Sequence, residues 1–239
     1  MKRHTIYAAS ALLALAIAGC ATTAEYVGPT FPLTPAAEDH YTTGTECLAQ
    51  GRYELAAEEF QQSVDLEPAA LLSHVRLGLA LFGDGRFGEA AGSFQHACEM
   101  TGGPGTWGSA SFCVLQAASL MRGSDIEQEQ ARQLLKAWSS PGIAMVGSSA
   151  ISTGSGSLPG GWKKLAGYLL GKVSEDDILG FDHAEAGYFT YLFVGLDNAR
   201  RGNHEEADAC LRTVLANVHS DGWRYDLAKI ELRRMASEG

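Results

Sequence analysis

The hydrophobic positions between Thr43 and Pro104 follow a helical spacing that occurs twice, one block after the other. In each block, apolar residues recur three or four positions apart in two stretches, with a glycine between the stretches. The first block contains CLAQGRYELAAEEF and the second contains LALFGDGRFGEAAGSF. This pattern predicts two consecutive pairs of amphipathic helices, each pair joined by a short turn.

Small and aromatic residues recur at one fixed period in the two blocks. Small residues let two helices approach closely, the aromatic residue fills the space between helix pairs, and the turn glycine reverses the chain at least cost. The recurring positions are Gly44, Gly51, Ala56 and Phe60, then Gly78, Gly85, Ala90 and Phe94. The period of about 34 residues and these residue types resemble the tetratricopeptide repeat. The alternative is an unrelated helical hairpin duplicated by chance. The resemblance predicts an all-α fold, a helical solenoid of antiparallel helix pairs.

The N-terminus has the pattern of an exported protein. Lys2 and Arg3 precede an apolar run, 6–18, that is shorter than the roughly 20 residues needed to span a bilayer. The run ends in IAGC, which resembles the lipobox of bacterial lipoproteins. That resemblance implies that residues 1–19 are removed and that Cys20 carries the lipid. Ala21 after the cysteine resembles the outer-membrane sorting pattern, so the protein is expected on the outer membrane, facing the periplasm. An ordinary signal peptide with a coincidental cysteine is the alternative.

The rest of the chain divides by composition. Residues 20–36 are rich in Thr and Pro and predict a flexible tether. Residues 37–141 hold the two repeats and a third, degenerate helix pair at 106–122 and 125–139. Residues 142–161 are dominated by Gly and Ser and predict a loop that interrupts the solenoid. The final segment is 162–239.

The C-terminal segment carries a second resemblance. Residues 162–179 read WKKLAGYLLGKVSEDDIL, with Ser174 placed to cap a short acidic helix. A further repeat follows, and then an amphipathic closing helix at 221–235. Its repeat positions are Gly195, Gly202, Ala207 and Leu211. Together these features resemble bacterial tetratricopeptide lipoproteins of the new lipoprotein I type. That family implies a scaffold that gathers cell-wall hydrolases and a protease.

Charge and motifs narrow the function classes. The formal net charge is −10, and loss of Lys2 and Arg3 makes it −12, so nucleic acid is not expected as a partner. Glu54, Glu58 and Glu59 are interpreted as a solvated helix face. No catalytic residues, cofactor or metal are predicted, because His204 and Glu205 lack a second histidine at the zincin spacing and no G-x-S-x-G or C-x-x-C occurs. An enzyme whose site has no sequence motif is the remote alternative.

Two further candidate sites favour ordinary structural interpretations. Gly103, Gly105 and Gly108 match G-x-G-x-x-G, but a helix precedes them where a dinucleotide site needs a strand, which predicts an inter-repeat turn. His183 and His204 are expected to be surface and turn residues, not metal ligands. Neither motif adds a cofactor to the prediction.

Four cysteines remain after Cys20. Counting outward from Gly103 places Cys98 and Cys113 about four residues out of level on successive antiparallel helices, an offset of roughly 6 Å. We therefore expect no disulfide between them. Cys47 and Cys210, like these two, are predicted to be small core residues.

The predicted binding surface is the concave face, which the first helix of each pair lines in tetratricopeptide domains. An apolar groove suits an amphipathic helix of another envelope protein. Its predicted residues are Leu72, Val75, Leu79 and Phe82 in the second repeat, and Phe189, Leu192 and Leu196 in the last. The lysines and asparagines of a carboxylate clamp are absent from these positions. The alternative is that the closing helix, or a second copy of the chain in a homodimer, covers this apolar stripe.

The predicted function is a membrane-anchored adaptor of the bacterial envelope, with a pilotin-like or outer-membrane assembly lipoprotein as the alternative.

Overall fold

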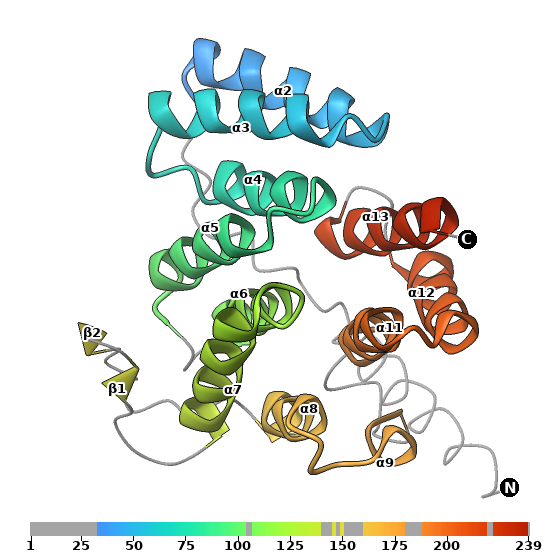
Figure 1. Cartoon of the computed structure of the whole chain (residues 1–239). Coiled ribbons are helices and arrows are strands. Elements are labelled where there is room, and N and C mark those ends of the chain that lie inside the picture. The colour runs from blue at the N-terminus through green and yellow to red at the C-terminus, as the bar shows by residue number, and fades with distance from the viewer. Residues whose placement is uncertain are drawn as a thin grey trace, which may run out of the picture.

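The computed structural model describes residues 33–103, 107–139, 145–146, 149–150, 160–179, 188–218 and 222–238. The predicted signal peptide, Cys20 and most of the tether lie outside these residues. Helix pairs stack one after another through the described chain, as predicted (Figure 1). The elements are α2 (Pro35–Ala49), α3 (Tyr53–Leu66), α4 (Leu71–Gly83), α5 (Phe87–Met100), α6 (Trp107–Leu120), α7 (Asp125–Ser139), β1 (Met145–Val146), β2 (Ser149–Ala150), α8 (Gly160–Leu169), α9 (Glu175–Leu179), α11 (Phe189–Arg201), α12 (His204–Asn217) and α13 (Trp223–Glu238).

Close helix contacts inside each pair explain the repeated small residues. A Cβ on Gly44 would lie 2.9 Å from the Phe60 ring, and one on Gly78 would lie 2.7 Å from the Phe94 ring. Both rings are fully buried. Leu211 takes the place of the ring in the last repeat, where a Cβ on Gly195 would meet it at 2.9 Å. The predicted period therefore describes real contacts between paired helices.

The turns inside the pairs use glycine in the left-handed region, which is open to glycine without steric cost. Gly51, Gly85 and Gly202 have φ of 78°, 81° and 82°. After each glycine, the next amide donates to the carbonyl oxygen five residues before it, as Arg52 does to Cys47 at 2.9 Å. These bonds satisfy carbonyls left free at a helix end.

In the third pair, the turn ends at a capping box at the N-terminus of α7. Ser124 and Glu127 bond reciprocally, the Ser124 amide donating to the Glu127 carboxylate at 2.7 Å. Ser174 caps α9 as predicted, since its Oγ accepts from the Asp177 amide at 3.2 Å. Inside the predicted Gly/Ser loop, β1 and β2 form an antiparallel pair, and α8 begins at Gly160. These two short strands were not predicted.

The predicted absence of a bond between Cys98 and Cys113 is wrong. The two cysteines form a disulfide, with their Cα atoms 5.5 Å apart. The prediction assumed a connection symmetric about Gly103. Instead, Gly102 and Gly103 both have positive φ, and the Gly103 amide donates to the Cys98 carbonyl at 2.8 Å, which folds this side of the connection back onto α5. The two helices are therefore in a different register, and Cys98 and Cys113 are level. Cys47 and Cys210 are free and buried, as expected.

The stack curves back on itself. Helices α2 to α7 form one arm, α8 and α9 cross below it, and α11 to α13 return along the other side (Figure 1). Helix α13 thereby packs against α4 as well as α11 and α12. The predicted closing helix is thus present over residues 223–238, with Asp221 outside the described residues. We call α2–α7 the N-terminal arm and α11–α13 the C-terminal arm.

Candidate functional site

The predicted groove residues lie mostly inside the protein. Five of the seven are at most 4% exposed: Val75, Leu79, Phe82, Leu192 and Leu196. Phe189 is half-buried, and Leu72 is 46% exposed. In this structure the five buried side chains are part of the core, so a partner would not reach them without a rearrangement.

The closing helix accounts for part of this burial. Asp226 of α13 pairs with Arg76 of α4, and Arg233 donates to the Ala49 carbonyl at 2.8 Å. Arg234 donates to the Phe82 carbonyl at 2.6 Å. These contacts place α13 against the C-terminal end of α2 and along α4 from Arg76 to Phe82. They agree with the alternative that the chain covers its own apolar stripe.

A buried ionic cluster holds the two arms together. Glu231 of α13 is 1% exposed and pairs with Arg122 and Arg234. Both guanidinium groups lie over the rings of Phe82 and Phe87, with centroid distances between 5.0 and 6.0 Å. The pKa of Arg122 is lowered, because burial disfavours its charged form. We call Arg122, Glu231 and Arg234 the closure cluster.

Arg122 also reaches the last repeat. It follows α6 and donates to the Leu196 carbonyl of α11 at 3.2 Å. One side chain therefore contacts both α11 and α13 of the C-terminal arm. Residues Arg122, Arg234 and Glu231 were not singled out from the sequence, because their partners are up to 152 positions away. Glu231 and Arg234 lie on α13 and Arg122 lies in the turn after α6, so none of the three stands at one of the recurring repeat positions.

Part of the concave face remains open in the first repeat. Subtracting the 34-residue period from Leu72, Val75 and Leu79 gives the equivalent positions Glu38, Tyr41 and Thr45. Glu38 is exposed and the other two are half-buried. The Tyr41 hydroxyl accepts a long bond of 3.4 Å from Arg76. This end of the concave face is more polar than the stripe predicted from the second repeat.

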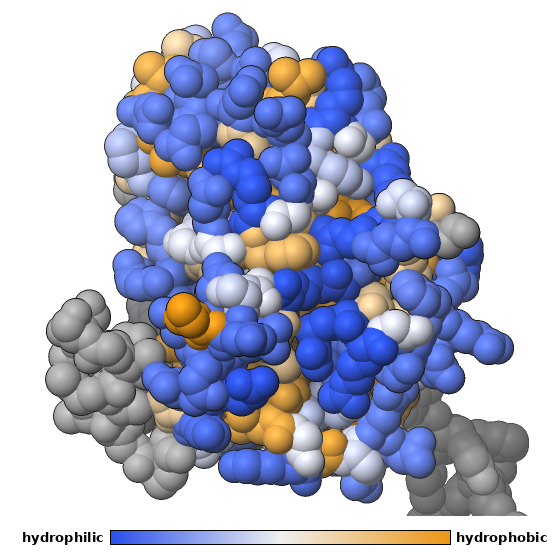
Figure 2. All heavy atoms as spheres, viewed as in Figure 1, coloured by the Kyte–Doolittle hydropathy of each residue, from blue (hydrophilic) through white to orange (hydrophobic). Residues whose placement is uncertain are grey.

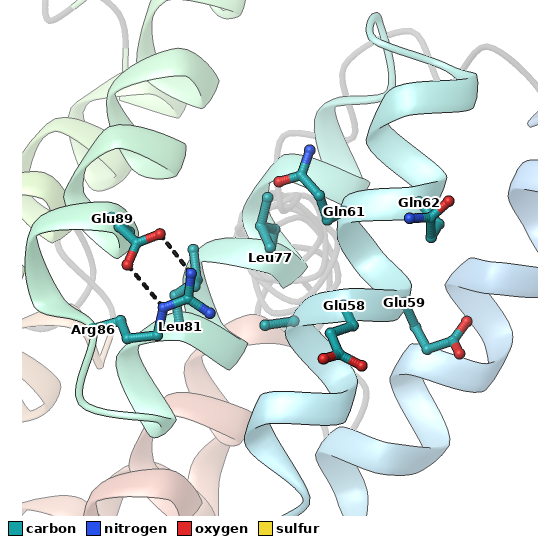
Figure 3. Close-up of a pocket in the computed structure, with 9 residues that line it drawn as sticks. Glu58, Glu59, Gln61, Gln62, Leu77, Leu81, Arg86 and Glu89 are labelled. Carbon is teal, nitrogen blue, oxygen red and sulfur yellow. Dashed lines mark hydrogen bonds and ion pairs between the residues drawn. The ribbon is translucent and has the colours of Figure 1, made fainter.

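A cleft opens on the opposite side of the N-terminal arm. Its volume is about 410 Å³, and its floor contains Leu77 and Leu81 of α4. At about 100° per residue, Leu77 and Leu81 lie roughly 100° and 140° round α4 from Arg76, whose side chain pairs with Asp226 of α13. Gln61 reaches toward Leu77, and the Arg86–Glu89 pair lies on the other side of the cleft, beside Leu81 (Figure 3). The complete lining is Ala57, Glu58, Glu59, Gln61, Gln62, Leu77, Leu81, Arg86 and Glu89.

The face of the protein seen in the view of Figure 1 is mainly hydrophilic, with small and separate apolar areas (Figure 2). Within the described ranges, no group of three or more His, Cys, Asp or Glu residues could hold a metal ion. His204 is exposed at the start of α12, and His183 lies outside the described residues. Gly103 follows α5 and Gly108 lies in α6, so the glycine pattern joins two helices, with Gly105 outside the described residues.

Comparison with known proteins agrees with the helix pairs seen in the structure. None of the described helices is long and apolar enough to cross a membrane. The comparison with curated proteins finds no match. Residues 41–104, which form most of α2 and all of α3 to α5, match the family model described as tetratricopeptide repeat. The chain therefore contains tetratricopeptide repeats, in an all-α helical solenoid.

Proposed function

We propose that the protein is a lipid-anchored scaffold of the bacterial cell envelope that binds other proteins through its helix pairs. The repeats carry this proposal, because stacked tetratricopeptide units present extended surfaces for protein partners. The closure cluster adds support, since it fixes the two arms in one arrangement and so presents those surfaces rigidly. Rigid surfaces bind partners at a lower entropic cost.

Two observations support an extracytoplasmic location. The Cys98–Cys113 disulfide is typical of oxidising compartments such as the periplasm. The N-terminal apolar run followed by IAGC supports export and lipidation at Cys20, and from there an outer-membrane position facing the periplasm. Buried acyl groups contribute about 0.8 kcal/mol per CH₂, so several chains anchor a protein without a spanning helix.

Fractionation tests the anchor. We expect Cys20→Ala to move the protein from the membrane fraction to the soluble periplasmic fraction in a bacterial host. A variant that stays in the membrane fraction after a high-salt wash would contradict lipid anchoring. Cys47→Ala is the matched control, because Cys47 is a free, buried cysteine of the helical domain.

Crosslinking tests the partners. The resemblance to lipoproteins of the new lipoprotein I type favours cell-wall hydrolases and envelope proteases, whereas a pilotin-like or assembly lipoprotein would crosslink to a secretin or barrel machinery. We expect the lipidated protein, crosslinked in cells and purified, to carry hydrolases or proteases. Recovery of secretin or barrel components would favour the alternative, and no reproducible partner would overturn the scaffold function.

A further inference from the structure

The cleft on the outer side of the first two repeats combines an apolar floor with a negatively charged rim. Leu77 and Leu81 are only 6% and 5% exposed, and they meet solvent at the bottom of the cleft. Glu58 stands exposed at the side formed by α3, and Gln61 projects over the floor (Figure 3). The bottom of the cleft is therefore apolar and its rim is acidic.

The rim keeps its negative character because its cation is already paired. Arg86 donates to both carboxylate oxygens of Glu89, at 2.8 and 2.5 Å. These bonds lower the pKa of Glu89 and raise that of Arg86. Asp84 and Glu54 also lie close enough to raise the pKa of Arg86. The charge of Arg86 is thus balanced locally. Glu59 is also paired, with His40 at 2.8 Å, so among the carboxylates that line the cleft Glu58 is left to attract a cation from outside.

We propose that this cleft docks a positively charged segment of a partner protein by taking up its long basic side chains. Lysine and arginine pack their aliphatic stems on apolar surface while the charged head stays near the rim. Leu77 and Leu81 fit the stem, and Glu58 fits the head. A volume of about 410 Å³ leaves room for more than a water molecule. The Gln61 amide nitrogen already donates to Asp65 at 2.8 Å, and its oxygen can accept from a backbone N–H of the segment.

The same molecule already binds arginines in this way. In the closure cluster, Arg122 and Arg234 lie over apolar rings and reach the Glu231 carboxylate. The outer cleft offers an apolar base and carboxylates in a similar order, but on the surface. It also lies on the side of α4 that α13 leaves uncovered. The partner therefore does not need to displace the closing helix.

This inference rests on the proposed function and specifies where and how one partner docks. A direct test uses a fluorescein-labelled 12-residue peptide with two arginines and two leucines, and the same peptide with glutamates replacing the arginines. Binding to the disulfide-bonded, folded protein is measured by fluorescence anisotropy at two salt concentrations. We expect the arginine peptide to bind, more weakly at the higher salt concentration, and the glutamate peptide not to bind.

Two variants locate the site. Glu58→Arg reverses the rim charge, and Gln61→Trp fills the opening without changing the charge. Each is expected to weaken arginine-peptide binding at least tenfold while the melting temperature stays within a few degrees of the parent. Glu129→Arg is the matched control, because it makes the same change of charge at an exposed position on α7.

The outcomes separate this proposal from the scaffold function. The cleft proposal would be wrong if Glu58→Arg bound the arginine peptide as tightly as the parent. It would also be wrong if Glu129→Arg weakened binding as much as Glu58→Arg does. If the parent protein sediments as a dimer and Glu58→Arg sediments as a monomer, the cleft is occupied by a second copy of this chain. That result would contradict docking of a different partner protein. If crosslinked partners remain on Glu58→Arg in cells, the scaffold function stands and the cleft proposal fails.

Discussion

The helix pairs and the closure interface are built by different interactions. Inside the first, second and last pairs, a glycine meets a phenylalanine or leucine side chain 16 positions later in the sequence, and the contact is apolar. Between the arms, α13 is held by charged residues, and their partners stand more than 100 positions away. Repeat packing is therefore local and steric, whereas closure is distant and ionic. The two can be perturbed separately.

The largest effect is expected from the closure cluster. Glu231→Ala leaves Arg122 and Arg234 buried without their carboxylate, which typically lowers the free energy of unfolding by about 3 to 5 kcal/mol. Thermal unfolding followed by circular dichroism measures the loss. Glu206→Ala, an exposed carboxylate on α12, is the control and should change little.

A triple variant distinguishes an unpaired charge from lost packing. Replacing Arg122 and Arg234 by methionine together with Glu231→Leu removes every charge of the closure cluster. We expect the triple variant to be more stable than Glu231→Ala. A triple variant as unstable as Glu231→Ala would show that shape, not charge, holds α13.

The joint between the second and third pairs is the next most sensitive region. Replacing Cys98 and Cys113 by alanine should lower the free energy of unfolding by about 3 kcal/mol, the entropic effect of opening a loop of about 15 residues. A reducing agent should lower the melting temperature of the parent but not of the double variant. Peptide mapping without reduction should recover the Cys98–Cys113 peptide pair. Two free thiols in that map would contradict the helix register.

A smaller loss is expected inside a pair. Gly78→Ala places a methyl group against the Phe94 ring, and overpacking of this kind costs about 1 to 3 kcal/mol. Gly92→Ala, on α5 with no atom within 4 Å of its added methyl, should stabilise by about 0.5 to 1 kcal/mol. Urea unfolding compares the two. Effects of the same sign would mean that helix propensity, not fit, explains the repeated glycine.

The smallest effect is a dependence on pH within the second pair. Burial lowers the pKa of His74, and neighbouring His96 lowers it further, while the hydrogen bond to the Pro68 carbonyl opposes both. The unfolded chain then binds more protons than the folded one below about pH 6.5, so stability falls as the pH drops through that range. We expect His74→Gln to reduce the fall in melting temperature between pH 7.5 and 5. His204→Gln, on the exposed start of α12, should leave the fall unchanged.

The sequence predicted the contacts that recur at a fixed period or act within a few residues, and it missed the contacts between distant segments. Gly44, Gly78 and Phe94 were predictable because one steric requirement recurs at a fixed period. Ser174 was predictable because a capping hydroxyl acts within four residues of its own helix. The groove residues were placed on the correct helices, but their exposure depended on α13, which no local pattern specifies.

The failure to predict the Cys98–Cys113 disulfide has a comparable cause. A disulfide needs the two Cα atoms within a narrow range of distances, so a shift of a few residues of one helix along the other decides whether the bond can form. The positive φ angles of Gly102 and Gly103 set that level, and glycine is compatible with many conformations. The outer cleft likewise arises from the spacing between α3 and α5, which depends on packing and not on periodicity.

Closure by the last helix also fixes the order in which the chain can complete its structure. The N-terminal helix pairs contain their own contacts and can form while the rest of the polypeptide is still being synthesised. The contact between Arg76 and Asp226 joins residues 150 positions apart, so it can form only after nearly the whole chain has emerged. Contacts of such separation slow folding. During that interval Phe82 and Arg122 lack their contacts with Arg234 and Glu231, and a nascent chain stalled before α13 presents an aggregation-prone face that the finished protein hides.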